Sequence, residues 1–180
     1  MMRPKLRRSF AAAQGGAAAL EFALVAPLLI TALLGAAEAF DLLRASGKIV
    51  AAANTIAELT AEGQNGQTTA SLGSIVAAAQ QILSPLPSTT LAVSIASIGY
   101  DANGKAMLLW QYSSGTGATV DLTKAAGLGS AGTSVIEASL VYPFTPMISA
   151  YVGAHTFRET ALSRPRLVPE VTYNGKTQYP

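Results

Sequence analysis

One long apolar run near the N-terminus constrains this chain more than any other feature of its sequence. Between Ser9 and Ala37 the only charged side chain is Glu21, with twelve uncharged residues before it and sixteen after it. A run of this length is typical of a segment that is directed to a membrane. A carboxylate in the middle of a span costs about 2.5 to 3.5 kcal/mol on insertion scales, so the position of Glu21 needs an explanation.

The charges around the run predict its orientation. Four basic residues lie before it, with no acid among them: Arg3, Lys5, Arg7 and Arg8. This asymmetry keeps the N-terminus in the cytoplasm and predicts export of the rest of the chain. The net charge of +2 belongs to the leader, because residues 17–180 hold eight basic and ten acidic side chains. We therefore expect no nucleic-acid partner.

Several kinds of segment fit this pattern. A conventional signal peptide would be cut after Ala39, since residues 37–39 read Ala-Glu-Ala. A twin-arginine signal is suggested by residues 7–10, which read Arg-Arg-Ser-Phe. A plain single-pass anchor would leave Glu21 near the cytoplasmic interface.

A further reading explains Glu21 directly. If a peptidase cuts after Gly16, the mature chain begins at Ala17, and residues 17–37 form a helix about 31 Å long, enough to cross the hydrocarbon core. Glu21 then lies about 6 Å from the new terminus, whose α-amino group has an ordinary pKa of about 8. At about 4 Å and an effective dielectric of 20, that pair is worth about 4 kcal/mol before desolvation. The same attraction could set the axial register between neighbouring subunits.

The sequence around this carboxylate resembles a known family. Residues 21–29 read EFALVAPLL, similar to the EFALVxPLL signature of the TadE/TadG-like family, pilin-like minor proteins of the tight adherence (Flp) pilus. The resemblance implies a processing site at Gly16 and Ala17, cut by a prepilin peptidase, and subunit pairing through Glu21 and Phe22. Pro27 removes a helix donor and frees the carbonyl of Ala23, so a kink is expected there.

The resemblance also implies a location, partners and a role in pilus assembly, adherence and biofilm formation. The protein would cross the bacterial inner membrane once, with a cytoplasmic leader at 1–16, a span at 17–37, a helix extension at 38–62 and a periplasmic α+β domain at 63–180. Its partners would be the peptidase, membrane lipid, other pilins or pseudopilins, and inner-membrane assembly proteins. Whether it enters the fibre, caps its tip or stays at its base is left open.

Helical periodicity continues beyond the span. Leu42, Ile49 and Ile56 recur every seven residues, with Leu59 close to the same face, which predicts a stripe packed on a domain. Two glycines and several amides at 62–67 end this helix, and apolar spacing predicts a second helix over 71–83.

From residue 90 the apolar period changes to two. Strands are predicted over 90–100, 105–112, 135–142 and 156–163, with a hairpin turn at 101–104 and a loop at 113–133. The strand that ends near Trp110, the Tyr-Pro-Phe-Thr-Pro segment at 142–146 and the Arg-Pro-Arg segment at 164–166 are similar to family members. The expected fold class is α+β: a long N-terminal membrane-spanning helix that continues onto a small antiparallel β-sheet domain, as in pilins.

No catalytic constellation is visible in the sequence. Residues 127–132 read GLGSAG, a literal GxGxxG, but a β-like segment follows where dinucleotide binding requires a helix. His155 is the only histidine and there is no cysteine, so a metal site is not expected. Glu58 and Glu62 fit a solvated helix face. We therefore expect a protein without cofactors that is not an enzyme.

Overall fold

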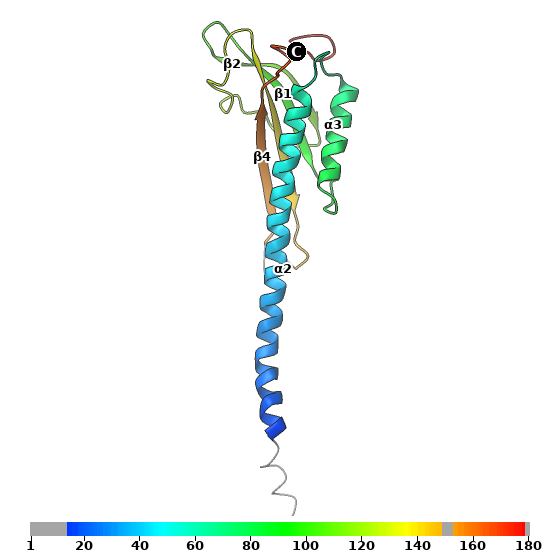
Figure 1. Ribbon diagram of the computed structural model, residues 1–180, viewed down its shortest axis with the longest axis vertical. Coiled ribbons are helices and arrows are strands. Elements are labelled where there is room, and N and C mark those ends of the chain that lie inside the picture. The colour runs from blue at the N-terminus through cyan, green and yellow to red at the C-terminus, as the bar shows by residue number, and fades with distance from the viewer. Residues whose placement is uncertain (1–13, 149–152, 179–180) are drawn as a thin grey trace, which may run out of the picture.

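The computed structural model describes residues 14–148 and 153–178, which form a small domain on a projecting helical stalk (Figure 1). Helix α2, Gln14–Ala61, is 48 residues long, and only its upper part packs on the domain. The other elements are α3 (Thr69–Ile82), β1 (Ala92–Tyr100), β2 (Ala106–Ser114), β3 (Ser134–Phe144) and β4 (His155–Ser163). The predicted α+β architecture, with a long apolar N-terminal helix followed by a small antiparallel sheet, is confirmed.

The sheet has the order β2-β1-β3-β4, and every neighbouring pair is antiparallel. The turn at 101–104 joins β1 to β2 as predicted. Asp101 Oδ1 accepts the N–H groups of Asn103 at 2.8 Å and Lys105 at 2.9 Å, and Gly104 takes φ +77°. Pro143 lies in β3 beyond Val141, the last residue that β3 pairs with β1, so its missing N–H costs no bond to that strand.

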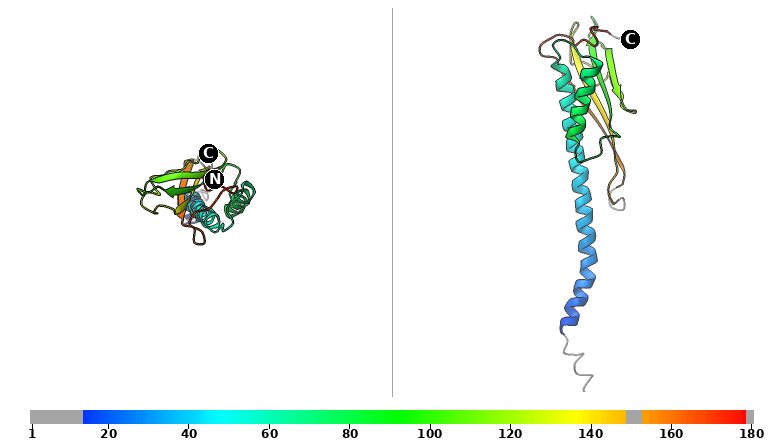
Figure 2. Two further views of the ribbon diagram at one scale, coloured as in Figure 1. Left: turned by 90° about the horizontal axis from the view of Figure 1, so that it is seen from above. Right: turned by 90° about the vertical axis from the view of Figure 1, so that its right-hand side faces the viewer.

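Both helices lie side by side on one face of the sheet (Figure 2). The buried face of α2 consists mostly of alanines, which allow close approach: Ala45, Ile49, Ala52, Ala53, Ile56, Ala57 and Ala61. The predicted stripe is confirmed at Ile49 and Ile56, and Leu42 is partly buried. The prediction that Leu59 lies close to the packed face is wrong, since this residue is 40% exposed. It lies three residues after Ile56 and is rotated about 60° away from the buried face.

Helix α3 starts one residue after Thr68, whose side chain accepts the N–H of Ser71 while the Ser71 hydroxyl accepts the N–H of Thr68. This capping box satisfies two N–H groups that the helix itself leaves free. The helix begins two residues before the predicted 71–83 and ends one residue earlier. Its buried face carries Leu72, Val76 and Ala79.

The C-terminal segment returns to the end of the domain far from the stalk (Figure 1). Trp110 is fully buried, donates its indole N–H to the carbonyl of Val171 at 2.7 Å, and stacks on Tyr173 at 5.3 Å between ring centroids. Gln67 donates its backbone N–H to the carbonyl of Thr172 at 2.7 Å. These contacts tie residues 171–173 to β2 and to the loop between α2 and α3.

The opposite face of the sheet is covered by the loop at 115–133. The Tyr100 hydroxyl donates to the carbonyl of Ala125 at 2.7 Å, and the N–H of Asp121 donates to Glu137 Oε1 at 2.9 Å. Glu137 is fully buried and its Oε2 has no hydrogen-bond partner among the described residues. Burial raises the pKa of Glu137 above its ordinary value, against a smaller opposing effect of the Asp121 N–H.

Candidate functional site

The lower half of α2 is the most unusual surface of the molecule. Every residue from 16 to 37 is exposed apart from Ala26 and Gly35, which are half-buried. Among the described residues, Gly16–Ala61 is the one helical stretch long and apolar enough to cross a membrane, and none of its most apolar part is buried. The helix could therefore serve as a membrane anchor.

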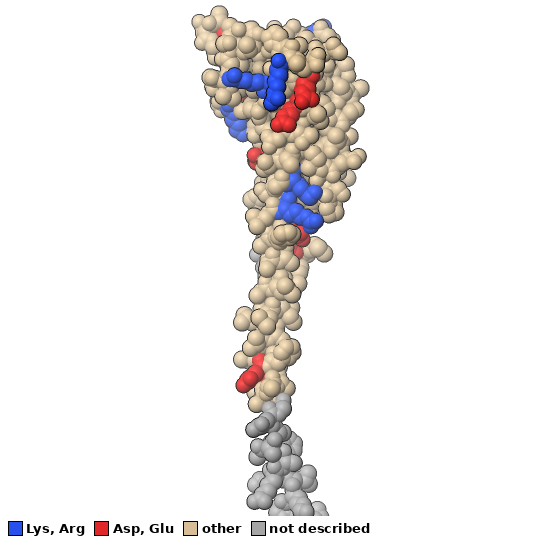
Figure 3. Space-filling view, viewed as in Figure 1, with Lys and Arg blue, Asp and Glu red and all other residues tan. Residues whose placement is uncertain are grey.

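Glu21 is exposed near the start of this bare helix. Figure 3 shows one acidic group low on the stalk, and Glu21 is the only charged residue between 16 and 37. The structure gives it no hydrogen bond or ion pair among the described residues. Phe22 beside it is 72% exposed. Neither residue touches the domain, so any pairing role of Glu21 and Phe22 requires another molecule or the new terminus.

The residues of the predicted cut also lie on this bare helix. Gly16 and Ala17 are helical and exposed in the uncut chain. A Cβ added at Gly16 would meet nothing within 4 Å, so packing gives no reason for a glycine there. The basic leader residues and the twin-arginine sequence at 7–10 lie outside the described residues. Cleavage after Gly16 stays a prediction.

Helix α2 runs through Pro27 without interruption. Pro27 has no N–H to donate to the carbonyl of Ala23. One turn later the Thr31 hydroxyl donates to the carbonyl of Leu28 at 2.8 Å. In Figure 2 the ribbon of the lower half of α2 curves gently and stays unbroken. The predicted kink at Pro27 stays a prediction.

Glu38 marks the point where α2 meets the domain, and the sequence analysis did not single it out. From residue 16 onward it is the first buried residue of the helix, with 5% of its surface exposed. Its Oε1 accepts the N–H of Ile148 at 2.8 Å, and its Oε2 has no partner among the described residues. An acid directly after the apolar run marks the end of that run, but nothing in the neighbouring sequence shows that its side chain is buried.

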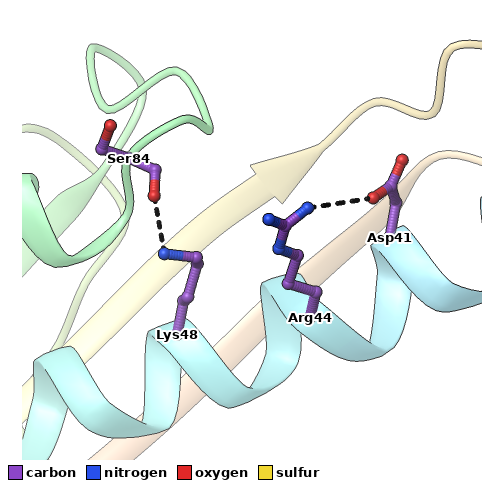
Figure 4. A network of polar contacts seen from close by, with 4 residues as sticks. All are labelled: Asp41, Arg44, Lys48 and Ser84. Atoms are coloured by element: carbon purple, nitrogen blue, oxygen red, sulfur yellow. Dashed lines mark hydrogen bonds and ion pairs between the residues drawn. The ribbon is translucent and has the colours of Figure 1, made fainter.

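A row of polar side chains follows on the same helix (Figure 4). Asp41 and Arg44 form an ion pair with 3.8 Å between Oδ1 and NH1, and both are about half exposed. Lys48 donates to the carbonyls of Ile82 at 2.7 Å and Ser84 at 2.6 Å. This ammonium satisfies carbonyls at the C-terminal end of α3, where the helix dipole favours a positive charge.

The other sequence features considered for chemistry lie apart from one another in the described chain. The GxGxxG segment at 127–132 lies in the loop before β3, beside a pocket of about 390 Å³ that Arg164 also lines. A strand follows it, so the structure does not fit a dinucleotide site. His155 is exposed and contacts Phe157 edge-on, with ring centroids 4.7 Å apart. No group of His, Asp or Glu in the described ranges could hold a metal ion.

Comparison with protein families gives a match to the stalk helix. Residues 16–58 match the family described as TadE-like protein. The match starts at Gly16, contains Glu21 and Pro27, and ends in the part of α2 that packs on the sheet. It confirms, over these residues, the resemblance to the TadE/TadG-like family. No curated protein and no solved structure matches the chain.

Proposed function

We propose, on the premise that residues 16–58 carry a TadE-like segment, that this protein is a minor pilin or pseudopilin that takes part in assembling a tight adherence pilus. A prepilin peptidase removes residues 1–16. The mature protein crosses the bacterial inner membrane once, through 17–37, and holds its α+β domain in the periplasm. It acts through contacts with other subunits and assembly proteins, and not as an enzyme.

The observation that carries this proposal is the bare apolar half of α2 with one carboxylate near its start. Twenty or so exposed apolar residues are stable when lipid or other helices surround them. Cleavage after Gly16 moves Glu21 to the end of that segment and creates an ammonium group about 6 Å away along the helix axis. The carboxylate then pairs with the terminal ammonium group of its own or a neighbouring subunit.

The outward face of α2 supports contact with other helices above the membrane as well. Phe40 is 64% exposed, and Leu43 and Val50 are also exposed, whereas the opposite side of the same turns packs on the sheet. Large apolar side chains exposed in a row on a helix favour a partner helix. Incorporation among other pilin-like subunits would cover both the span and this face.

The test is the N-terminus of the protein isolated from membranes of cells that carry the matching prepilin peptidase. We expect the chain to start at Ala17, and to keep its leader when the peptidase is inactivated. A start at Phe40 would contradict the proposal and indicate a conventional signal peptide. An uncut chain in the membrane would also contradict it.

A second candidate is an uncleaved, membrane-anchored periplasmic binding domain. The observation that favours it is a pocket beside Glu38, whose carboxylate is buried with one oxygen unpaired. This candidate predicts a full-length chain in membranes with and without the peptidase. The same determination of the N-terminus therefore separates the two.

A further inference from the structure

The outward face of α2 above the proposed span carries a regular row of exposed residues. They are spaced alternately by three and four positions: Phe40, Leu43, Gly47, Val50 and Asn54. This is the heptad spacing of two helices that wrap around each other, in which the first and fourth residues of every seven face the partner. The next position of the repeat, Ala57, is buried against the domain, so the row ends at Asn54. We call these five residues the outer seam.

The same spacing continues downward into the proposed span. Leu29, Leu33 and Ala36 stand at the equivalent positions of the repeat and are exposed. From residue 29 to residue 54 the repeat covers about four heptads, which is the length expected of paired helices. A second helix that follows the outer seam therefore stays in contact with α2 inside the membrane as well.

Two members of the outer seam have no role within their own domain. A Cβ added at Gly47 would meet nothing within 4 Å, so packing does not require the glycine, although glycine in a helix interior costs stability. A glycine that faces another helix allows close approach of the two backbones. Asn54 is exposed and makes no side-chain hydrogen bond within the described residues. An asparagine at an inward position of paired helices specifies their register and number.

Charged side chains of both signs follow directly above the outer seam. Glu58 and Glu62 of α2 line one small pocket together with Arg164 and Arg166 of the segment after β4. In Figure 3 acidic and basic side chains lie side by side at this upper end of the molecule. All four residues are exposed, and no ion pair joins them within the part of the chain that the structure describes. The face therefore presents acids on one side and bases on the other.

We infer that the outer seam binds a second copy of this chain, in a parallel pair with a two-fold axis along α2. Such an axis exchanges left and right across the face, so the acids of each copy meet the bases of the other. Each seam residue faces its own counterpart, and the two Asn54 amides bond to each other. Asp41, Arg44 and Lys48 lie beside the seam and already bond within the chain, so they bring no repulsion to it (Figure 4).

The charges decide between a second copy and a different helix. An apolar row alone fits many partners, whereas a patch with acids and bases side by side is complementary to itself. The inference rests on the proposed function and deepens it, because it names the partner of the outward face. Two chains anchored in one membrane hold their domains on the same side, so their helices run parallel, as this symmetry requires.

The first experiment uses the absence of cysteine from the chain. Val50→Cys places a thiol in the outer seam, and Leu59→Cys places one about two and a half turns further on, on the other flank of the helix. The two sites are matched, since Val50 is 39% and Leu59 is 40% exposed. Each full chain is reconstituted alone in vesicles and oxidised. Thiols that face each other across the axis are within reach of a disulfide, so we expect Val50→Cys to form covalent dimers at least about tenfold faster.

The second experiment reverses the charges in pairs. Glu58→Arg with Glu62→Arg leaves only bases in the patch, and Arg164→Glu with Arg166→Glu leaves only acids. Each variant should self-associate about tenfold more weakly than the unmodified chain, and an equimolar mixture should recover pairing as mixed dimers. The single neutral change Glu58→Gln should have little effect, because an exposed ion pair is individually weak. Circular dichroism checks the fold of each variant.

Equal rates of disulfide formation at Val50→Cys and Leu59→Cys would overturn the inference. So would a mixture of the two charge-reversed chains that pairs no better than each chain alone. A Val50→Cys chain that links in cells only to a different subunit, and stays monomeric alone, would also overturn it. Flotation with the vesicles separates this inference from the proposed function. A chain that does not float refutes the membrane anchoring and the parallel pair together, whereas a floating chain that starts at Ala17 in cells but forms no dimer refutes this inference alone.

Discussion

The substitution Glu21→Gln tests the central mechanism, because it removes one charge from an exposed side chain that touches nothing in the domain. We expect normal membrane insertion and normal cleavage after Gly16, since the change leaves the local shape almost intact. We expect loss of association with other pilus subunits. The domain should melt as in the unmodified protein, because its core begins far along α2.

The size of the effect follows from the geometry of the cut chain. A carboxylate and an ammonium group about 4 Å apart attract by about 4 kcal/mol at an effective dielectric of 20. Placing the acid in the membrane costs about 2.5 to 3.5 kcal/mol, which Gln largely avoids. The association constant should therefore fall by at least about fivefold, which corresponds to a net loss of about 1 kcal/mol. It should fall by at most about a thousandfold, which corresponds to the full loss of about 4 kcal/mol.

The assay is co-purification of the other pilus subunits after crosslinking in cells, with the mass of each variant measured in parallel. Glu21→Asp keeps the charge on a shorter side chain and should recover part of the association. Glu58→Gln changes an exposed acid of the same helix outside the span and should associate normally. Association of Glu21→Gln at the unmodified level, with the leader removed, would refute the pairing role of Glu21.

Three further predictions address the cut, the domain and its pH dependence. Gly16→Leu should block cleavage and leave a chain that is heavier by residues 1–16 in membranes, whereas a normal mature mass would show that Gly16 is not needed for the cut. Lys48→Met should lower the free energy of unfolding by about 1 to 3 kcal/mol, because it loses the hydrogen bonds to the carbonyls of Ile82 and Ser84. Arg44→Met loses only a surface ion pair and should lower it by less than about 1 kcal/mol. Urea titration of the two variants measures both losses, and equal losses would contradict a stabilising role of the Lys48 hydrogen bonds. Because burial raises the pKa of Glu137, its carboxyl group favours the folded state below the ordinary value of 4.5, and this contribution is lost as pH rises through the raised value. The gain in stability on Glu137→Gln relative to the unmodified protein should therefore be larger at pH 7 than at pH 4, and a pH-independent difference in urea titrations would contradict this.

Periodic segments of this sequence were predictable because each has a strong local cause. The apolar run, the alternation in β1 and the Asp-Ala-Asn-Gly turn predicted their elements within a few residues. The exposure of Leu59 was not predicted, because a seven-residue repeat marks a direction on the helix without giving the width of the covered face. That width depends on where the sheet and α3 end.

The buried acids could not be found by pattern. Glu137 lies between apolar residues of β3, and its carboxylate is covered by a loop that is 16 residues away in sequence at Asp121. The hydrogen bond between Glu38 and Ile148 joins residues 110 apart. Contacts over such separations depend on the complete sheet, so no local signal distinguishes these acids from solvated ones.

Glu21 and Glu38 stand at the two ends of the apolar segment, and the structure gives them different surroundings. They are 17 residues apart, about 26 Å along the helix, which is close to the thickness of the hydrocarbon core. No described residue of the domain contacts Glu21, so the pairing that the proposed function gives it would need a chain terminus or a second molecule. Glu38 is enclosed by its own domain, where its Oε1 accepts the N–H of Ile148 and its Oε2 is buried without a partner among the described residues. The same residue type thus stands exposed at one end of the span, where the proposed function uses it for subunit register, and buried inside the domain at the other.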